Sequence, residues 1–157
     1  MSLDPETRAQ LIDSVARFVR EKLVPAEDRV SSEDRVPDDI VQGMSELGLF
    51  GLSIPTEYGG LGLTMEEEAL VLFELGQTSP AFRSVIGTNV GIGSQGLVMF
   101  GRQDQKDEWL PKIASGEIIT SFCLTEPGAG SDAAALRTTA IRKGDVYVVN
   151  GTKRYIT

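Results

Sequence analysis

The spacing of apolar residues changes near Gly116, and this change constrains the fold more than any other feature of the sequence. Up to that point, apolar residues recur mostly at steps of three and four, which is the pattern of amphipathic helices. Beyond it, β-branched runs and turn pairs dominate, which is typical of antiparallel strands. We therefore expect a mainly α chain: an N-terminal helical bundle over residues 1–116, followed by the first antiparallel strands of an incomplete β-domain over residues 117–157.

Helix boundaries can be predicted from proline, glycine and capping residues. Thr64 and Glu67 have the spacing of a capping box, which opens a helix, and Gly48 suits a C-cap. We expect Pro25 to end the first helix and residues 27–34 to form a loop or a frayed end. The expected helices cover residues 5–24, 38–47, 64–77, 80–100 and 104–115.

The two least regular parts of the helical region are open to interpretation. Residues 49–63 are rich in glycine, yet Leu49, Phe50 and Leu52 indicate a loop that covers the core. The expected helix 80–100 has internal glycines, each of which costs up to about 1 kcal/mol relative to alanine. Close packing of another helix and a ligand-lined face both remain possible explanations for these small residues.

Strands are expected only in the second region. The expected strands cover residues 118–125, 137–142 and 146–149. Turns at Lys143-Gly144-Asp145 and at Asn150-Gly151 would connect them, and Tyr155 onward looks like the start of a further strand. Three antiparallel strands without a closing partner make a poor sheet, so we expect the β-domain to be incomplete.

Composition removes several classes of function. The chain has no histidine and one cysteine, Cys123, which excludes Ser-His-Asp and Cys-His catalysis, histidine metal clusters, iron–sulfur clusters and internal disulfides. The net charge of −8 argues against nucleic acid and anionic membranes as partners. No apolar run reaches the roughly 18 residues of a transmembrane helix, and the N-terminus lacks the pattern of a signal peptide. We expect a cytoplasmic protein without a metal site.

The segment Thr125–Asp132, with the sequence TEPGAGSD, is the strongest candidate site. Its glycines leave backbone N–H groups free to bind an anionic ligand, whereas an ordinary turn between strands has the same composition. The segment is not a Walker A loop, which needs Gly-Lys-Ser/Thr. It is not a Rossmann fingerprint either, because that needs a third glycine and then a helix.

Other candidate groups have plainer interpretations. Glu126 suits a turn or a salt bridge better than a general base, and Cys123 suits a small buried side chain better than a reactive thiol. The Glu66–Glu68 run suits a solvated helix N-terminus better than a metal site. Arg83 suits the protein surface, where it could also meet an anionic group.

Four segments resemble, in order, the motifs of the acyl-CoA dehydrogenases, and the resemblance covers essentially the whole chain. The segments are residues 55–62, 109–117, 123–132 and 150–157. Members of that family have an N-terminal helical domain, a middle β-domain and a C-terminal four-helix domain. The resemblance implies FAD as cofactor, dehydrogenation of an acyl-CoA with a carboxylate as base, an electron-transfer flavoprotein as redox partner, and a homo-oligomer, dimer or tetramer.

The matching motifs also imply which residues bind cofactor and substrate. Those implied to bind FAD are Phe122, Leu124, Thr125, Gly130, Ser131, Tyr155 and Thr157. Gly130 and Ser131 would face the phosphates, and Ser131 would also touch the CoA part of the substrate. Tyr155 stands where most members have tryptophan, so an aromatic platform is kept. Arg83 resembles the arginine with which glutaryl-CoA dehydrogenases hold a substrate carboxylate.

The catalytic base of the family lies in the C-terminal domain, which this chain lacks, so the resemblance implies no catalytic residue here. FAD binding by the chain alone is expected to be weak or absent, and the chain alone is expected to be inactive. An alternative is a non-catalytic helical module that self-associates through apolar surface. Exposure of Leu49, Phe50 and Leu52 would favour that alternative.

Overall fold

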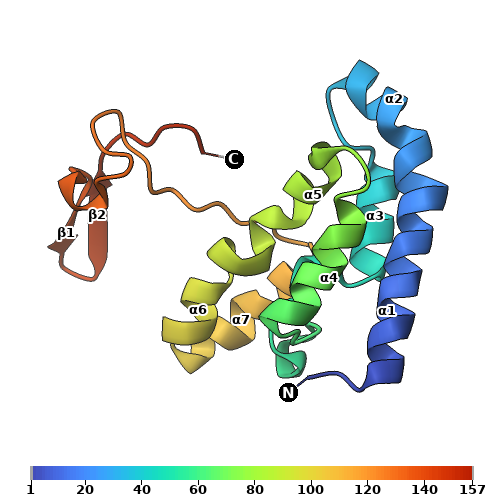
Figure 1. Ribbon diagram of the computed structural model, residues 1–157. Helices are drawn as coiled ribbons and strands as arrows, with labels where there is room; N and C mark the ends of the chain where they lie inside the picture. Colours follow the sequence, from blue (N-terminus) through green and yellow to red (C-terminus); the bar gives the residue numbers. More distant parts are fainter. Residues whose placement is uncertain (1, 157) are drawn as a thin grey trace. The chain divides into compact units, whose positions relative to one another are not determined.

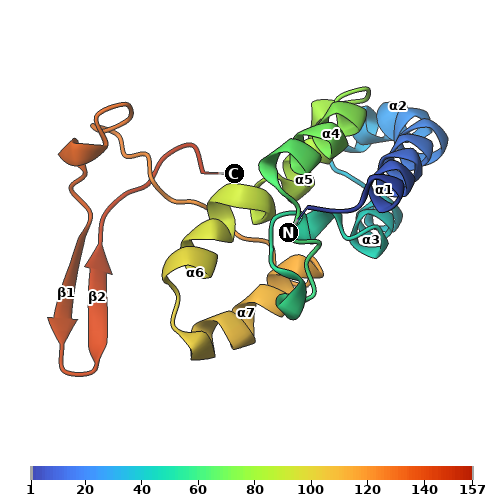
Figure 2. The same ribbon diagram turned by 60° about the horizontal axis from the view of Figure 1, so that its bottom comes forward.

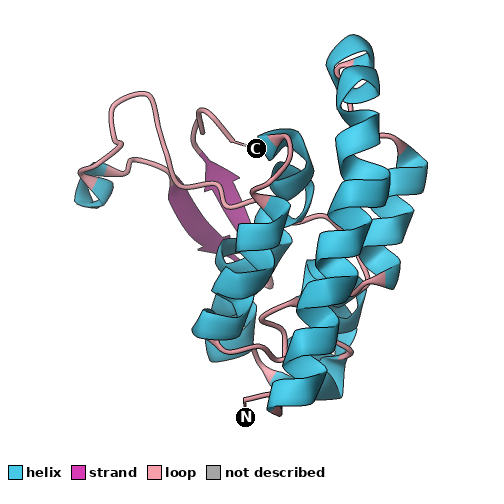
Figure 3. Ribbon diagram, turned by 45° about the vertical axis from the view of Figure 1, so that its right-hand side comes forward, coloured by secondary structure: helices cyan, strands magenta, loops and turns pink. Residues whose placement is uncertain are grey.

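The computed structural model describes residues 2–156, which divide into two compact units. A helical unit extends to Thr120, and a second unit begins at Ser121 and holds a β-hairpin. Figure 1 follows the chain through both units, and Figure 3 distinguishes helices from strands by colour. The expectation of a mainly α chain with the first antiparallel strands of a β-domain is confirmed.

The helical unit contains seven α-helices in the part of the chain that the structure describes. They are α1 (Pro5–Phe18), α2 (Val24–Glu33), α3 (Asp38–Glu46), α4 (Met65–Leu75), α5 (Pro80–Gly87), α6 (Gln95–Phe100) and α7 (Gln103–Ala114). Helix α1 packs against α4, and α6 packs against α7. Figure 2 shows α1, α3 and α4 gathered at one end of this unit and α6 and α7 at the other.

Pro25 does not end the first helix, and the expected loop over residues 27–34 is wrong. A π-helical turn, Val19–Leu23, joins α1 to α2, and the N–H of Val24 bonds to the carbonyl of Val19 five residues back. Pro25 lies in the first turn of α2, directly after this wider turn, and has no N–H to donate to the preceding turn. The wider turn thus lets helical structure continue to Glu33.

The segment between α3 and α4 is a buried loop, as its apolar residues predict. Leu49, Phe50, Leu52 and Ile54 are all fully buried. The first three belong to the main core among α1, α3, α4 and α5, whereas Ile54 packs with Leu110 of α7 in a smaller cluster. Because these side chains are covered, they offer no apolar surface for self-association.

Glu67 ties the N-terminal segment to α4. The predicted capping box is confirmed, since the Thr64 side chain accepts the Glu67 N–H and the Glu67 carboxylate accepts the Thr64 N–H at 2.8 Å. The same carboxylate accepts the Ser2 hydroxyl at 2.8 Å and the Leu3 N–H at 2.7 Å. Glu67 is only 2% exposed, so a solvated run is the wrong interpretation at this position. These bonds, led by the one from the Thr64 N–H, lower the pKa of Glu67 to about 2.

Acid should weaken this tie within a defined pH range. Because the pKa falls from 4.5 to about 2 on folding, the stability from Glu67 is complete above pH 4.5 and is lost as the pH falls towards 2. We expect Glu67→Gln to reduce the pH dependence of the unfolding free energy in that range, measured by urea titration. Glu66→Gln, on an exposed neighbour, is the control. A parental pH dependence in Glu67→Gln would contradict the assignment.

The expected single helix over residues 80–100 is wrong, because the chain breaks between α5 and α6. Within the connecting turn Asn89–Gly93, Gly91 has a φ of 81°, which favours glycine. Gly93 packs so closely against Thr120 that an added Cβ would overlap the threonine hydroxyl. Close packing therefore explains Gly93, and backbone conformation explains Gly91.

A buried asparagine holds this break to the end of α7 and to the segment that follows it. Asn89 is fully buried, and its Nδ2 donates to the carbonyl oxygens of Ile113 at 3.0 Å and Ile118 at 2.8 Å. Its Oδ1 accepts the Thr120 N–H at 2.8 Å and the Thr120 hydroxyl at 3.0 Å. The side-chain amide thus bonds to a separate part of the chain through both its donor and its acceptor atoms.

The second unit is built around one hairpin. Strands β1 (Thr139–Lys143) and β2 (Val146–Asn150) pair antiparallel, with Thr139 opposite Asn150 and Lys143 opposite Val146. Gly144, with a φ of 62°, makes the turn between them. The two expected strands on either side of this turn are therefore confirmed.

The expected strand over residues 118–125 is not formed. The Leu124 N–H bonds to the carbonyl of Phe122, only two residues back, at 3.1 Å, and this local turn is incompatible with an extended strand. Thr120 is bonded into the helical unit instead. Tyr155 has a φ of 58° and starts no strand within the described residues. Apolar composition without a partner strand did not produce β-structure.

Candidate functional site

The base of the TEPGAGSD loop is a closed turn. The Glu126 N–H donates to the Ala129 carbonyl at 2.9 Å, and the Ala129 N–H donates to the Glu126 carbonyl at 3.2 Å. Both residues are buried. Pro127 fixes its own φ within the turn. The start of the loop is therefore rigid, and Gly130 and Ser131 follow it as exposed residues.

The Glu126 carboxylate is the centre of the hydrogen bonds in this unit. One oxygen accepts the Arg137 N–H at 2.7 Å, and the other accepts the Thr138 N–H at 2.9 Å and the Thr138 hydroxyl. Lys153 Nζ lies 3.0 Å from the second oxygen, so the expected salt-bridge role of Glu126 is confirmed. These donors, chiefly the Thr138 hydroxyl, lower the pKa of Glu126 to about 2. A carboxylate with so low a pKa is poorly suited to act as a general base.

The groups left available in the loop are donors. Thr125 is half-buried, and among the described residues its hydroxyl has no hydrogen-bond partner. Gly130 and Ser131 also make no hydrogen bond within residues 2–156. An added Cβ on Gly128 or Gly130 would meet nothing within 4 Å. Free amides and hydroxyls around open space suit the phosphate groups of a cofactor such as FAD.

An apolar strip precedes these donors. Phe122 and Leu124 are 51% and 37% exposed, which suits contact with a flat aromatic ring such as that of a flavin. Cys123 between them is exposed, so the expectation of a buried cysteine is wrong. The local turn at this point, in place of a strand, leaves its side chain uncovered.

The structure joins the loop to the segment that precedes Tyr155. The Arg154 N–H donates to the Thr125 carbonyl at 2.9 Å, and the Arg154 guanidinium lies 5.0 Å from the centre of the Tyr155 ring. Tyr155 is largely exposed. Thr157, also implied to bind the cofactor, lies outside the described residues.

Arg83 belongs to α5 of the helical unit and is exposed. Its guanidinium lies over Gly87 one turn later, where a Cβ would come within 2.7 Å of Nη1. Its charge acts on Glu68 of α4, whose pKa is raised by burial and partly lowered again by Arg83. Gly87 thus provides the space in which this arginine lies along its own helix.

Two residues of structural consequence were missed in the sequence. Lys153 pairs with Glu126, and Asn89 bridges the helix break. In the sequence, Lys153 stands out only as part of the family motif that begins at Asn150-Gly151. No local sequence pattern indicates the role of Asn89, because its hydrogen-bond partners lie 24 to 31 residues further along the chain.

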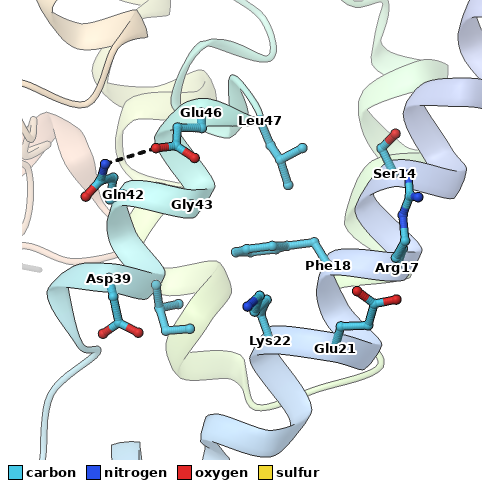
Figure 4. Close-up of a pocket in the computed structure, with 11 residues that line it drawn as sticks. Ser14, Arg17, Phe18, Glu21, Lys22, Asp39, Gln42, Gly43, Glu46 and Leu47 are labelled. Carbon is cyan, nitrogen blue, oxygen red and sulfur yellow. Dashed lines mark hydrogen bonds between the residues drawn. The ribbon is translucent and has the colours of Figure 1, made fainter.

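Hollows of different sizes lie on the described surface. One, of about 240 Å³, lies beside the loop and is lined by Glu126, Pro127 and Thr138 among others. Another, of about 510 Å³, lies between α1 and α3, and Figure 4 shows the Phe18 ring extending across it towards Gly43. A third, of about 530 Å³, is lined by residues of α2 and by Ser79 and Ala81. Neither of these two larger hollows contains a residue predicted to bind cofactor or substrate.

Within residues 2–156, no group of three or more cysteine, aspartate or glutamate side chains is arranged to hold a metal ion. Among the same residues, every helix is too short or too polar to cross a membrane.

Comparisons with known proteins assign both units. The family model for the N-terminal domain of acyl-CoA dehydrogenases matches residues 5–117, and the model for the middle domain matches residues 121–157. The very long-chain specific acyl-CoA dehydrogenase of Homo sapiens is 40% identical over 149 residues, which cover 94% of this chain and 22% of that protein. An acyl-CoA dehydrogenase of Bacillus subtilis is 36% identical over 91% of this chain and 38% of its own length.

Solved structures agree with this assignment. A glutaryl-coenzyme A dehydrogenase in complex with glutaryl-CoA superposes with a TM-score of 0.89 at 35% identity, over 99% of this chain and 40% of that one. An acyl-CoA dehydrogenase of Bacillus anthracis complexed with FAD gives a TM-score of 0.83 at 33% identity, over 99% of this chain and 28% of that one. The chain therefore spans less than half the length of these relatives.

Proposed function

The chain belongs to the acyl-CoA dehydrogenase family, and from this premise we propose that it forms the N-terminal part of an FAD-dependent enzyme that desaturates acyl-CoA thioesters. The observation that carries the proposal is the rigid Glu126–Ala129 turn. It is followed by free donors at Gly130 and Ser131 and preceded by exposed apolar side chains. This combination suits one ligand with both phosphates and a flat ring.

The proposed roles follow the chemistry of each group. The amides of Gly130 and Ser131 would hold the cofactor phosphates, and the Thr125 hydroxyl would donate to the edge of the ring. Phe122, Leu124 and Tyr155 would pack against the ring, with Thr157 beside it. Bound FAD would accept the β-hydrogen of the acyl-CoA.

Acid–base chemistry is proposed to lie outside this chain. Lys153, Arg137 and Thr138 stabilise the charged form of Glu126 and lower its pKa to about 2, so it is a weak base for a substrate proton. We propose that a carboxylate in a further domain acts as base, and that the chain alone is inactive. An electron-transfer flavoprotein as redox partner and a homo-oligomeric enzyme are part of the same proposal.

Substrate contact is proposed at two residues. Ser131 would touch the CoA part, from its exposed position beside the phosphate-facing amides. Arg83 would hold a carboxylate at the far end of an acyl chain. Its exposed guanidinium and the similarity to the glutaryl-CoA complex support this.

Flavin binding tests the proposed function. A polypeptide that continues this sequence to the length of its relatives should purify yellow, and its visible flavin absorbance should bleach when acyl-CoA is added. The 157-residue chain alone should bind FAD more weakly, on the order of tenfold or more, because it supplies only part of the site. A colourless longer protein that takes up no added FAD would overturn the proposal.

A further inference from the structure

Three successive residues at the start of the loop, Leu124, Thr125 and Glu126, are each bonded to the segment that carries Tyr155. Lys153 Nζ donates to the Leu124 carbonyl at 3.0 Å and to Glu126 Oε1 at 3.0 Å. Between these contacts, the Arg154 N–H donates to the Thr125 carbonyl at 2.9 Å. One lysine side chain therefore connects two stretches that lie 27 to 29 residues apart in sequence.

We propose that the Lys153–Glu126 ion pair is a positioning clamp that fixes the distance between the TEPGAGSD loop and Tyr155, so that both face the same flavin. This rests on the proposed function. Lys153 then acts on Glu126 and on the loop backbone, and it does not bind a cofactor phosphate. Both members of the pair are positioning residues.

The burial of the pair supports this role. The side chains of Lys153 and Glu126 are 24% and 6% exposed, so water competes little for the contact. The carboxylate also accepts the backbone N–H groups of Arg137 and Thr138 where the chain enters β1. The clamp thereby joins the loop, the start of the hairpin and the Tyr155 segment.

The geometry explains why neither partner can be replaced by a neutral group. A glutamine at position 126 has one oxygen in place of two, so its NH₂ group would have to face at least one of the present donors. A methionine at position 153 keeps the length of the side chain and leaves the carboxylate without its cation. Lys153→Arg keeps the cation, so it should keep most of the ion pair and of the FAD binding that depends on it.

The first experiment measures the clamp itself in the 157-residue chain. Hydrogen exchange should become faster at the amides of Arg137 and Thr138 in Lys153→Met, by about tenfold or more, because their acceptor is released. Amides of the helical unit should not change. Lys143→Met, which removes an exposed lysine at the end of β1, is the matched control. Parental exchange at both amides in Lys153→Met would overturn the clamp.

The second experiment tests the effect on the flavin in the longer, FAD-loaded protein. Lys153→Met should shift the flavin absorption band and reduction potential and weaken FAD binding, whereas Lys153→Arg and Lys143→Met should resemble the parent. Faster exchange with an unchanged flavin spectrum and affinity would reduce the pair to a structural role and overturn the positioning proposal. A parent that binds no FAD would overturn the proposed function, while the exchange result would still decide whether the clamp exists.

Discussion

Asn89→Ala is expected to lower the unfolding free energy of the helical unit by about 4 kcal/mol, because each buried polar group left without a partner costs roughly 1–3 kcal/mol. The truncation leaves the Ile118 carbonyl without its donor and the Thr120 N–H without its acceptor, whereas the Ile113 carbonyl still accepts the Gly116 N–H at 3.2 Å. Domains have total stabilities of roughly 5–15 kcal/mol, so the loss is a large fraction. Urea unfolding followed by far-ultraviolet circular dichroism measures it.

Two further variants sharpen this experiment. Asn89→Asp keeps the shape of the side chain but turns an oxygen towards the two carbonyls, so it should be about as harmful as the alanine. Gln77→Ala removes an exposed amide that makes one 3.3 Å bond to the Phe73 carbonyl, and should change stability by less than about 0.5 kcal/mol. If Asn89→Ala matched Gln77→Ala, the bridge across the helix break would contribute nothing to folding.

Gly60→Ala is expected to destabilise the same unit by about 3 kcal/mol through overpacking. An added Cβ would lie 2.6 Å from the carbonyl carbon of Ile54 and closer still to its oxygen. That carbonyl cannot easily move away, because it accepts the Gly62 N–H at 2.9 Å. The effect can be measured by the same urea titration.

The adjacent glycine provides the control. Gly59 has a φ of 81°, and a Cβ there would meet no atom within 4 Å, so Gly59→Ala should cost only the strain of a left-handed residue, about 1 kcal/mol. The two substitutions are one position apart, but overlap with a neighbouring carbonyl destabilises Gly60→Ala, whereas backbone strain destabilises Gly59→Ala. Equal losses for both variants would show that the buried loop relaxes around the new methyl group.

The sequence located the candidate site but not its internal connections. The TEPGAGSD segment was identified from its residue types and from its resemblance to a family motif. The pairing of Glu126 with Lys153 joins residues 27 positions apart, and no local pattern specifies such a pair. The exposure of Cys123 was also not predictable, because apolar neighbours suggested a strand that needs a partner to form.

The sequence by itself determined the helical region, the hairpin and the capping box at Thr64, because these depend on the periodicity and chemistry of neighbouring residues. Only the folded structure shows where the predicted helices continue and where they break. The chain continues as helix past Pro25 and breaks at Asn89–Gly93. It also decided that Glu67 is buried. The helix passes Pro25 because a π-helical turn precedes it. At the break and at Glu67 the physical reason is that hydrogen bonds and close contacts between distant segments outweigh local preferences of about 1 kcal/mol per residue.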